Sequence, residues 1–190
     1  INGYSDIVQQ KWNDFAVIFG LKEDVFSNPH HIRLKKSITV ILIGAGHRGN
    51  IYADYSIEYP DEMQVVAVAE INQSRLRKFQ KKHQLKDSNC FTYWNELLSL
   101  PKFADAVIIA TPDHLHTEPC LAALEKGYDV LIEKPIAPTE RECRLILEKV
   151  IESGRIVGVC HVLRYSPYFR EIKEVIDKKI IGDIISVQHM

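Results

Sequence analysis

The sequence lacks a long apolar run, a paired cysteine motif and an excess of charge of either sign. No apolar stretch approaches the roughly 18 residues of a membrane-spanning helix, so we expect no membrane partner. With 24 basic and 25 acidic residues and a net charge of -1, we expect no nucleic-acid partner either. The sequence starts at Ile1 and shows no signal segment, and we expect the chain to be incomplete at both ends.

The four cysteines, Cys90, Cys120, Cys143 and Cys160, are scattered, and no two of them form a C-x-x-C pair. Three of them are surrounded by apolar residues, which predicts reduced, buried thiols and a cytoplasmic protein. The remaining composition is that of an ordinary globular protein, and 190 residues are enough for one core and part of another.

Residues 1–36 do not follow the pattern of the rest. They are expected to form a leader with a short amphipathic helix in "KWNDFAVIFG" and a polar connector after it, and we assign them no role. From residue 37 onward, short apolar runs alternate with amphipathic helical patterns. The expected strands cover 37–43, 63–70, 89–91, 104–111, 128–133 and 155–160. This alternation predicts an α/β fold with a doubly wound parallel sheet, a Rossmann domain over residues 37–160.

Several residues indicate where the helices between these strands begin and end. Asn72 and Thr117 are expected to cap helices, and "TERE" at 139–142 fits a capping box. Gly127 and Gly154 are expected just beyond helix ends. Apolar spacing predicts an inward face on two of these helices, made of Ile51, Tyr52 and Tyr55 within 47–58, and of Cys143, Ile146, Leu147 and Val150 after the capping box. After the sheet, Ser166-Pro167 begins another helix, and "DIISVQHM" is typical of a strand. Residues 161–190 therefore predict the first helix and strand of a truncated α/β substrate domain.

The stretch "ITVILIGAGHRGNIYADY" contains a G-x-G-x-x-G turn between an expected strand and an expected helix. In this context Gly44 permits the tight turn, Gly46 allows a pyrophosphate to approach the backbone, and Gly49 allows the helix to pack closely on the strand. The helix N-terminus would offer free N–H groups to the phosphates. The alternative is a plain strand-to-helix turn without a ligand.

Glu70 ends the second expected strand, 21 residues beyond Gly49. A carboxylate there accepts hydrogen bonds from the adenosine ribose and repels a 2′-phosphate, which favours NAD over NADP. The less favoured NADP stays open, because Arg48 or Arg75 could hold a phosphate.

"TPDHLH" (111–116) and "EKP" (133–135) follow the fourth and fifth expected strands. Asp113, His114 and His116 could form a metal cluster, but no third anchored ligand is evident and we expect no metal. Lys134 at the end of a buried strand indicates a polar partner or a function, and the alternative is a solvated loop lysine.

Taken together, the sequence resembles the Gfo/Idh/MocA oxidoreductases, named for glucose–fructose oxidoreductase and inositol dehydrogenase. The resemblance covers residues 37–190. It rests on "GAGHRG", Glu70, "TPDHLHTEPCLAALEKGYDVLIEKP", "HVLRYSP" and "IGDI", in this order.

The resemblance implies a cofactor-binding set that runs from the pyrophosphate through the adenosine and the middle of the cofactor to the nicotinamide. In that order it comprises Gly44, Gly46, His47, Arg48, Gly49, Glu70, Arg75, Thr111, Pro112, His116, Glu133, Lys134, His161 and Arg164. It also implies that Lys134 is catalytic, contacting the nicotinamide ribose and orienting or polarising the substrate hydroxyl. The Lys134–Pro135 bond is expected to be cis, as is common in this family.

For function, the resemblance implies an NAD-dependent dehydrogenase that transfers a hydride to or from a hydroxyl-bearing carbon of a sugar, cyclitol or related polyol. Its main acid–base group would fall after Met190, in a second domain that also supplies oligomer contacts, so a homo-oligomer is expected at full length. The 190 residues alone would bind cofactor without appreciable turnover. Two alternatives stay open: an NAD-dependent glycosidase that uses transient sugar oxidation, and a non-catalytic NAD-binding regulatory or partner-binding protein.

Overall fold

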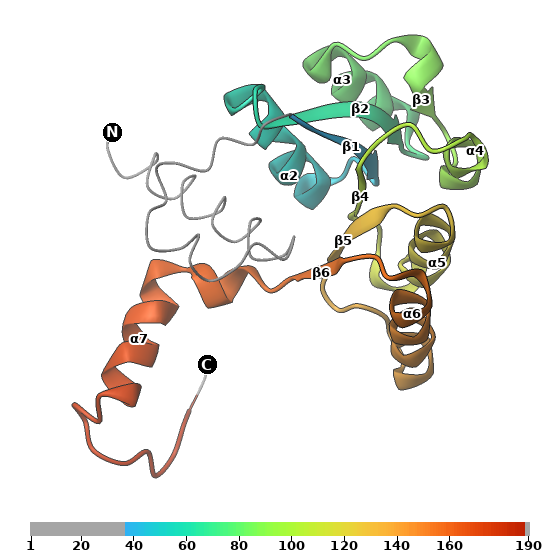
Figure 1. Ribbon diagram of the computed structural model, residues 1–190. Helices are drawn as coiled ribbons and strands as arrows, with labels where there is room; N and C mark the ends of the chain where they lie inside the picture. The colour runs from blue at the N-terminus through green and yellow to red at the C-terminus, as the bar shows by residue number, and fades with distance from the viewer. Residues whose placement is uncertain (1–36, 189–190) are drawn as a thin grey trace. The chain divides into compact units, whose positions relative to one another are not determined.

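A computed structural model describes residues 37–188 (Figure 1). The leader predicted over residues 1–36, with its helix, lies outside the described residues. The chain divides after Cys160 into two compact units, which are described separately below. None of the helices formed by the described residues is long and apolar enough to cross a bilayer.

The unit that ends at Cys160 is built on a six-stranded sheet in the order β3-β2-β1-β4-β5-β6. Every pair of neighbouring strands is parallel. The strands are β1 (Ile38–Ile43), β2 (Met63–Ala69), β3 (Cys90–Phe91), β4 (Ala106–Ile109), β5 (Asp129–Glu133) and β6 (Val157–Cys160). This order confirms the predicted doubly wound fold. The chain adds β2 and β3 on one side of β1 and then β4, β5 and β6 on the other, so the strand order reverses between β1 and β4. Ligands of such sheets bind at the carboxyl ends of the strands beside that point.

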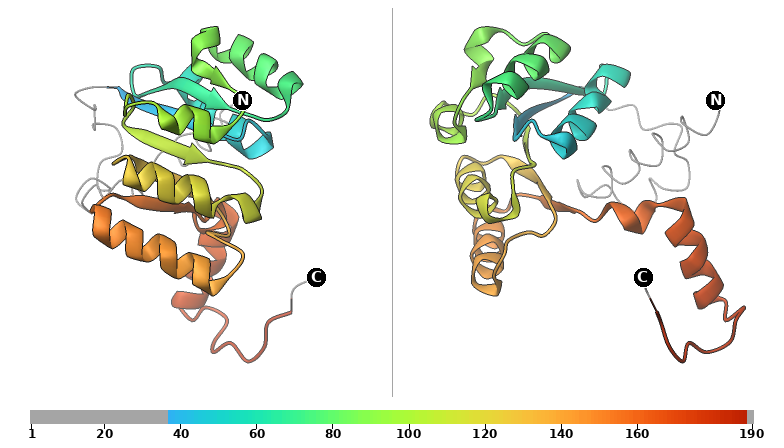
Figure 2. Two further views of the ribbon diagram at one scale, coloured as in Figure 1. Left: turned by 90° about the vertical axis from the view of Figure 1, so that its right-hand side faces the viewer. Right: turned by 180° about the vertical axis from the view of Figure 1, so that it is seen from behind.

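Helices connect the strands and cover the sheet (Figures 1 and 2). They are α2 (His47–Glu58), α3 (Gln73–His83), α4 (Trp94–Ser99), α5 (Thr117–Glu125) and α6 (Glu140–Ser153), with 3-10 turns η2 (Asp87–Asn89) and η3 (Asp113–Leu115). α5 and α6 lie side by side, and apolar residues of α4, α5 and α6 join those of β1, β4 and β5 in the main core. The central residues of β1, β4 and β5 are apolar and buried because both faces of a parallel sheet are covered.

Most predicted helix boundaries are confirmed. Asn72 Oδ1 accepts a hydrogen bond from the Arg75 N–H at 3.0 Å, and Thr139 caps α6. Gly154 ends α6 in the left-handed conformation, with a φ of 61°. Thr117 differs from the prediction: the α5 cap position is His116, and Thr117 is the first helical residue. Its hydroxyl instead donates to Glu142 Oε1 on α6, at 3.3 Å.

Two predicted helix faces differ from the structure. On α6, Leu147 was expected to face inward but is 57% exposed, and only Ile146 of this helix is fully buried. On α2, the buried positions are Gly49 and Ala53, whereas Ile51, Tyr52 and Tyr55 are only partly buried. At Gly49 the helix starts so close to the turn that a Cβ would lie 2.0 Å from the Gly44 oxygen.

The described residues of the second unit, 161–188, form η4 (Val162–Tyr165) and α7 (Pro167–Asp177). The predicted helix is confirmed, and Pro167 occupies its first turn, where a proline is tolerated. The predicted strand is not formed over residues 183–188, the described part of "DIISVQHM". A strand requires a neighbour for its N–H and C=O groups, and no described residue pairs with this segment.

Candidate functional site

In the turn between β1 and α2, two glycines stand at positions where a side chain would overlap neighbouring backbone atoms. Gly44 has a φ of +93°, and a Cβ there would lie 2.7 Å from the Ala110 oxygen. A Cβ on Gly49 would lie 2.0 Å from the Gly44 oxygen. Both positions therefore allow α2 to start directly against the ends of β1 and β4.

Gly46 differs from these two glycines because none of residues 37–188 occupies the space beside it. A Cβ built there meets no atom of these residues within 4 Å, and its φ of -72° suits any residue. Gly46 is the N-cap of α2, with no side-chain cap and no acidic residue in the first turn. The start of α2 therefore presents positive charge and open space to a ligand.

Two polar side chains hold this turn in place. Glu70, 6% exposed at the end of β2, accepts a hydrogen bond from the Ala45 N–H at 2.8 Å through Oε2. Its Oε1 accepts from the Asn72 N–H, also at 2.8 Å. Asn50 Nδ2 donates to the carbonyl oxygens of Ala45 and Gly46. Sequence reasoning did not single out Asn50, although its position in the first turn of α2 was a usable signal.

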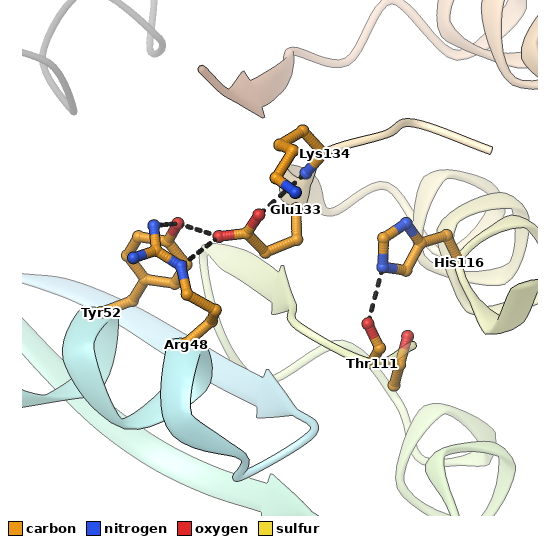
Figure 3. A network of polar contacts seen from close by, with 6 residues as sticks. All are labelled: Arg48, Tyr52, Thr111, His116, Glu133 and Lys134. Atoms are coloured by element: carbon orange, nitrogen blue, oxygen red, sulfur yellow. Dashed lines mark hydrogen bonds and ion pairs between the residues drawn. The ribbon is translucent and has the colours of Figure 1, made fainter. Parts of the chain in front are cut away.

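Arg48 connects this turn to the end of β5 (Figure 3). Its Nε donates to Glu133 Oε1 at 2.7 Å, and its Nη2 donates to the Tyr52 hydroxyl at 2.5 Å. The Tyr52 hydroxyl in turn donates to Glu133 Oε1. The sequence pattern predicted Tyr52 only as part of an apolar face, not as a hydrogen-bond partner of Arg48 and Glu133. Its spacing of four residues from Arg48 on one helix was the available signal.

Glu133 is a buried carboxylate, 6% exposed. Burial alone would raise its pKa, but hydrogen bonds from Tyr52 and Arg48 lower the pKa below its ordinary value. Its second oxygen, Oε2, accepts from the Lys134 N–H at 3.0 Å. The carboxylate therefore fixes the backbone at the point where β5 ends.

Lys134 directly follows β5, and its side chain is exposed. The Lys134–Pro135 peptide bond is cis, as expected. Among residues 37–188, no ion pair involves its ammonium group. A charged amine thus stands at the carboxyl edge of the sheet, on a backbone held by Glu133.

His116 is fully buried at the start of α5. Its Nδ1 lies 2.8 Å from the Pro135 oxygen and its Nε2 lies 2.8 Å from the Thr111 oxygen. The ring therefore joins the segments that follow β4 and β5 through these two carbonyl oxygens. His114, the other histidine of the considered metal cluster, is exposed.

The remaining predicted site residues of this unit lie around the same strand ends. His47 is exposed in the first turn of α2, and Arg75 is exposed in the first turn of α3. Thr111 and Pro112 follow β4, and Pro112 is exposed. Parallel strands thus bring three sequence segments, 44–49, 111–116 and 133–135, to one edge of the sheet.

His161 and Arg164 belong to the second unit. His161 precedes η4 and Arg164 lies within it, and both are exposed. Their predicted place beside the nicotinamide stays a prediction.

Comparison with known proteins identifies the class to which this fold and site belong. Residues 38–161 match the model of the oxidoreductase family with an NAD-binding Rossmann fold, GFO_IDH_MocA. The match covers more than half of the chain, which therefore belongs to the Gfo/Idh/MocA oxidoreductase family, as the sequence motifs indicated.

Among similar proteins, Oxidoreductase P35 from Formosa agariphila is 29% identical over 147 residues, which cover 77% of this chain and 45% of the relative. An inositol 2-dehydrogenase from Pseudomonas savastanoi pv. phaseolicola is 35% identical over 121 residues, 63% of this chain and 35% of the relative. The chain thus spans less than half the length of these relatives.

Two solved structures show the same fold. The WlbA dehydrogenase from Bordetella pertussis, in complex with NADH and UDP-GlcNAcA, superposes with a TM-score of 0.69 at 21% identity, over 78% of this chain and 42% of the other. A 3-ketoreductase from Actinomadura kijaniata, in complex with NADP, gives a TM-score of 0.68 at 24% identity, over 78% and 46% of the two chains.

Proposed function

We propose that the protein is an NAD-dependent dehydrogenase that transfers a hydride between the nicotinamide and a hydroxyl-bearing carbon of a sugar, cyclitol or related polyol. The observation that carries this proposal is the open space at Gly46, directly before the uncapped start of α2. Within the described part of the chain, neighbouring atoms fill the space beside the other two glycines of the turn and none fills the space beside Gly46. A pyrophosphate there would meet the N–H groups and the positive end of α2.

The residues of the turn support NAD rather than NADP. Each oxygen of the buried Glu70 carboxylate already accepts one backbone N–H and keeps a second lone pair, which would accept from a ribose hydroxyl, while the charge would repel a 2′-phosphate. Arg48 gives its Nε and Nη2 donors to Glu133 and Tyr52, and the paired carboxylate partly offsets its charge, which makes it a weaker phosphate ligand. Arg75 remains the cation that would accommodate NADP, and its exposed place on α3 is compatible with either cofactor.

The cofactor, once bound, supplies the hydride chemistry, and the chain supplies binding, orientation and charge. Lys134 directly follows β5 at the carboxyl edge of the sheet, and we propose that it faces the nicotinamide end of the bound cofactor. Its ammonium group would hold the substrate hydroxyl and stabilise negative charge that develops on its oxygen. His161 and Arg164 are proposed to line the nicotinamide.

The substrate class rests on the relatives, among which inositol 2-dehydrogenases recur. Homo-oligomers are common in this family, and we include a homo-oligomer in the proposal. The four cysteines are free thiols, which supports a reducing, cytoplasmic environment.

The test is a comparison of the full-length protein with its Lys134→Ala variant. NADH binding is measured by fluorescence titration, and NAD reduction is followed during addition of inositols and aldoses. We expect NADH to bind at least about tenfold more tightly than NADPH, a difference of about 1.4 kcal/mol. Lys134→Ala should retain NADH binding and lose NAD reduction. Binding without NAD reduction by any polyol would instead favour a glycosidase or a regulatory protein, and absence of NADH binding would overturn the proposal.

A further inference from the structure

We propose that Tyr52 is a positioning residue for Lys134 and that it acts through the carboxylate of Glu133. The inference rests on the proposed function for its catalytic consequence, because that consequence depends on the role of Lys134. Its structural part, that Tyr52 fixes the end of β5, stands on the geometry alone.

The Tyr52 hydroxyl lies between a cation and an anion (Figure 3). It accepts a hydrogen bond from Arg48 Nη2 at 2.5 Å and donates its own proton to Glu133 Oε1. The ring also lies under the guanidinium, 5.0 Å from its central carbon. Arg48 can only donate, so the single proton of the Tyr52 hydroxyl is directed to Glu133.

The opposite side of the carboxylate holds the lysine backbone. Glu133 Oε2 accepts from the Lys134 N–H at 3.0 Å. One oxygen of this buried carboxylate therefore binds the Lys134 backbone, while the other binds the Tyr52 hydroxyl. Rotation of the carboxylate would break the bond to the Lys134 N–H. Tyr52 and Arg48 prevent that rotation by holding Oε1.

The charge states agree with these roles. Glu133 stays ionised and able to accept on both oxygens, because the hydrogen bonds outweigh the effect of burial on its pKa. Tyr52 stays protonated and able to donate, because burial, with further contributions from Cys160 and Glu133, raises its pKa. Cys160 pairs with Glu133 across β5 and β6, so the network spans α2 and two strand ends.

The network also connects two parts of the site that are far apart in sequence. Arg48 and Tyr52 belong to the helix that starts at the glycine turn, whereas Lys134 follows β5. Tyr52 therefore fixes the backbone that carries the amine, relative to the turn at which the pyrophosphate is proposed to bind. Hydride transfer depends steeply on such relative placement.

Tyr55 provides a matched control on the same helix. Its hydroxyl donates to Glu62 Oε2 at 2.6 Å, another tyrosine–glutamate hydrogen bond, and its ring stacks on Tyr59. The Tyr55→Phe change therefore removes a bond of the same kind from α2 without touching Glu133 or Lys134.

The first experiment measures the network directly by NMR in the full-length protein, without use of activity. It compares Tyr52→Phe and Tyr55→Phe by the 13C titration of the Glu133 carboxyl and by hydrogen exchange of the Lys134 amide. In Tyr52→Phe we expect the pKa of Glu133 to rise and the Lys134 amide to exchange about fivefold faster, as loss of one hydrogen bond implies. Tyr55→Phe should leave both unchanged. If Tyr52→Phe does not fold, Glu133→Gln should give the same loss of Lys134 protection.

The second experiment measures turnover and cofactor binding of the same variants. We expect Tyr52→Phe to lower kcat about tenfold, the effect of about 1.4 kcal/mol in the barrier, while the Kd for NADH changes less than about twofold. Equal behaviour of the two variants, or a weaker NADH affinity with unchanged kcat, would overturn the inference. If the unmodified protein binds no NADH, the proposed function fails, and the NMR comparison still decides whether Tyr52 positions Lys134.

Discussion

Arg48 Nε lies 2.7 Å from Glu133 Oε1, which joins the first turn of α2 to the end of β5 across 85 positions of sequence. The Glu133 side chain is 8% exposed, whereas that of Arg48 is 37% exposed. The pair thus combines a buried anion with a cation at the surface, and the anion depends on its donors much more than the cation depends on its acceptor.

We therefore expect Arg48→Met to destabilise the fold by about 1–3 kcal/mol, the range for loss of a charged hydrogen bond. Urea unfolding measures this change. Adding Glu133→Gln should recover part of the loss, since the second change removes the buried charge that the first leaves unpaired. Strictly additive losses in the double variant would mean that the two side chains do not depend on each other.

The glycines of the turn should respond differently to alanine. Gly49→Ala places a Cβ 2.0 Å from the Gly44 oxygen, so it should cost at least about 3 kcal/mol or prevent folding. Gly46→Ala should fold with nearly unchanged stability, because no atom of the described residues lies within 4 Å of its new Cβ. It should nevertheless weaken NADH binding by at least about tenfold. Unchanged NADH affinity in Gly46→Ala would remove the main support for the pyrophosphate site.

His116→Ala should lower the free energy of unfolding by about 2–4 kcal/mol, because it leaves a cavity and removes the partner of two carbonyl oxygens. His114→Ala is the control: this exposed histidine is two residues away, and its loss should change stability by less than about 0.5 kcal/mol. Thermal unfolding of the two variants gives the comparison. Similar shifts would contradict the bridging role of His116.

His83 should make stability depend on pH in the mildly acidic range. Burial lowers its pKa from 6.5, although Asp54 at 3.7 Å favours the charged form and Lys82 opposes it. The unfolded chain then takes up a proton before the folded protein does, so stability should decrease as the pH falls from 6.5 through the lower folded pKa.

Replacing His83 by glutamine should flatten this dependence in urea unfolding measured between about pH 5 and pH 7, the range over which histidine titrates. The packing of the ring on Phe79, with centroids 4.2 Å apart, should make the variant less stable at neutral pH. If stability depends on pH in the glutamine variant as it does in the unmodified protein, a group other than His83 causes that dependence.

Several features of the fold were predictable from sequence because their signals are local. Runs such as "ITVILI" specify buried strands by composition alone, and Asn72, Thr139 and Gly154 mark helix ends through contacts within a few residues. The glycine turn was predictable for the same reason, since its three positions and the strand before it form one continuous segment.

Other features depended on which distant segments the sheet brings together. The Tyr52–Glu133 bond spans 81 positions, and no periodicity within α2 distinguishes a tyrosine that contacts a carboxylate from one that enters the core. The burial of His116 depends on a carbonyl supplied by the segment after β5. The exposure of Leu147 depends on how α6 packs beside α5, and the predicted strand at 183–188 has no described partner. The sequence by itself determined the elements and the glycine turn through short-range propensity and spacing, whereas the partners of the polar side chains were decided only when parallel strand pairing placed their ends at one edge.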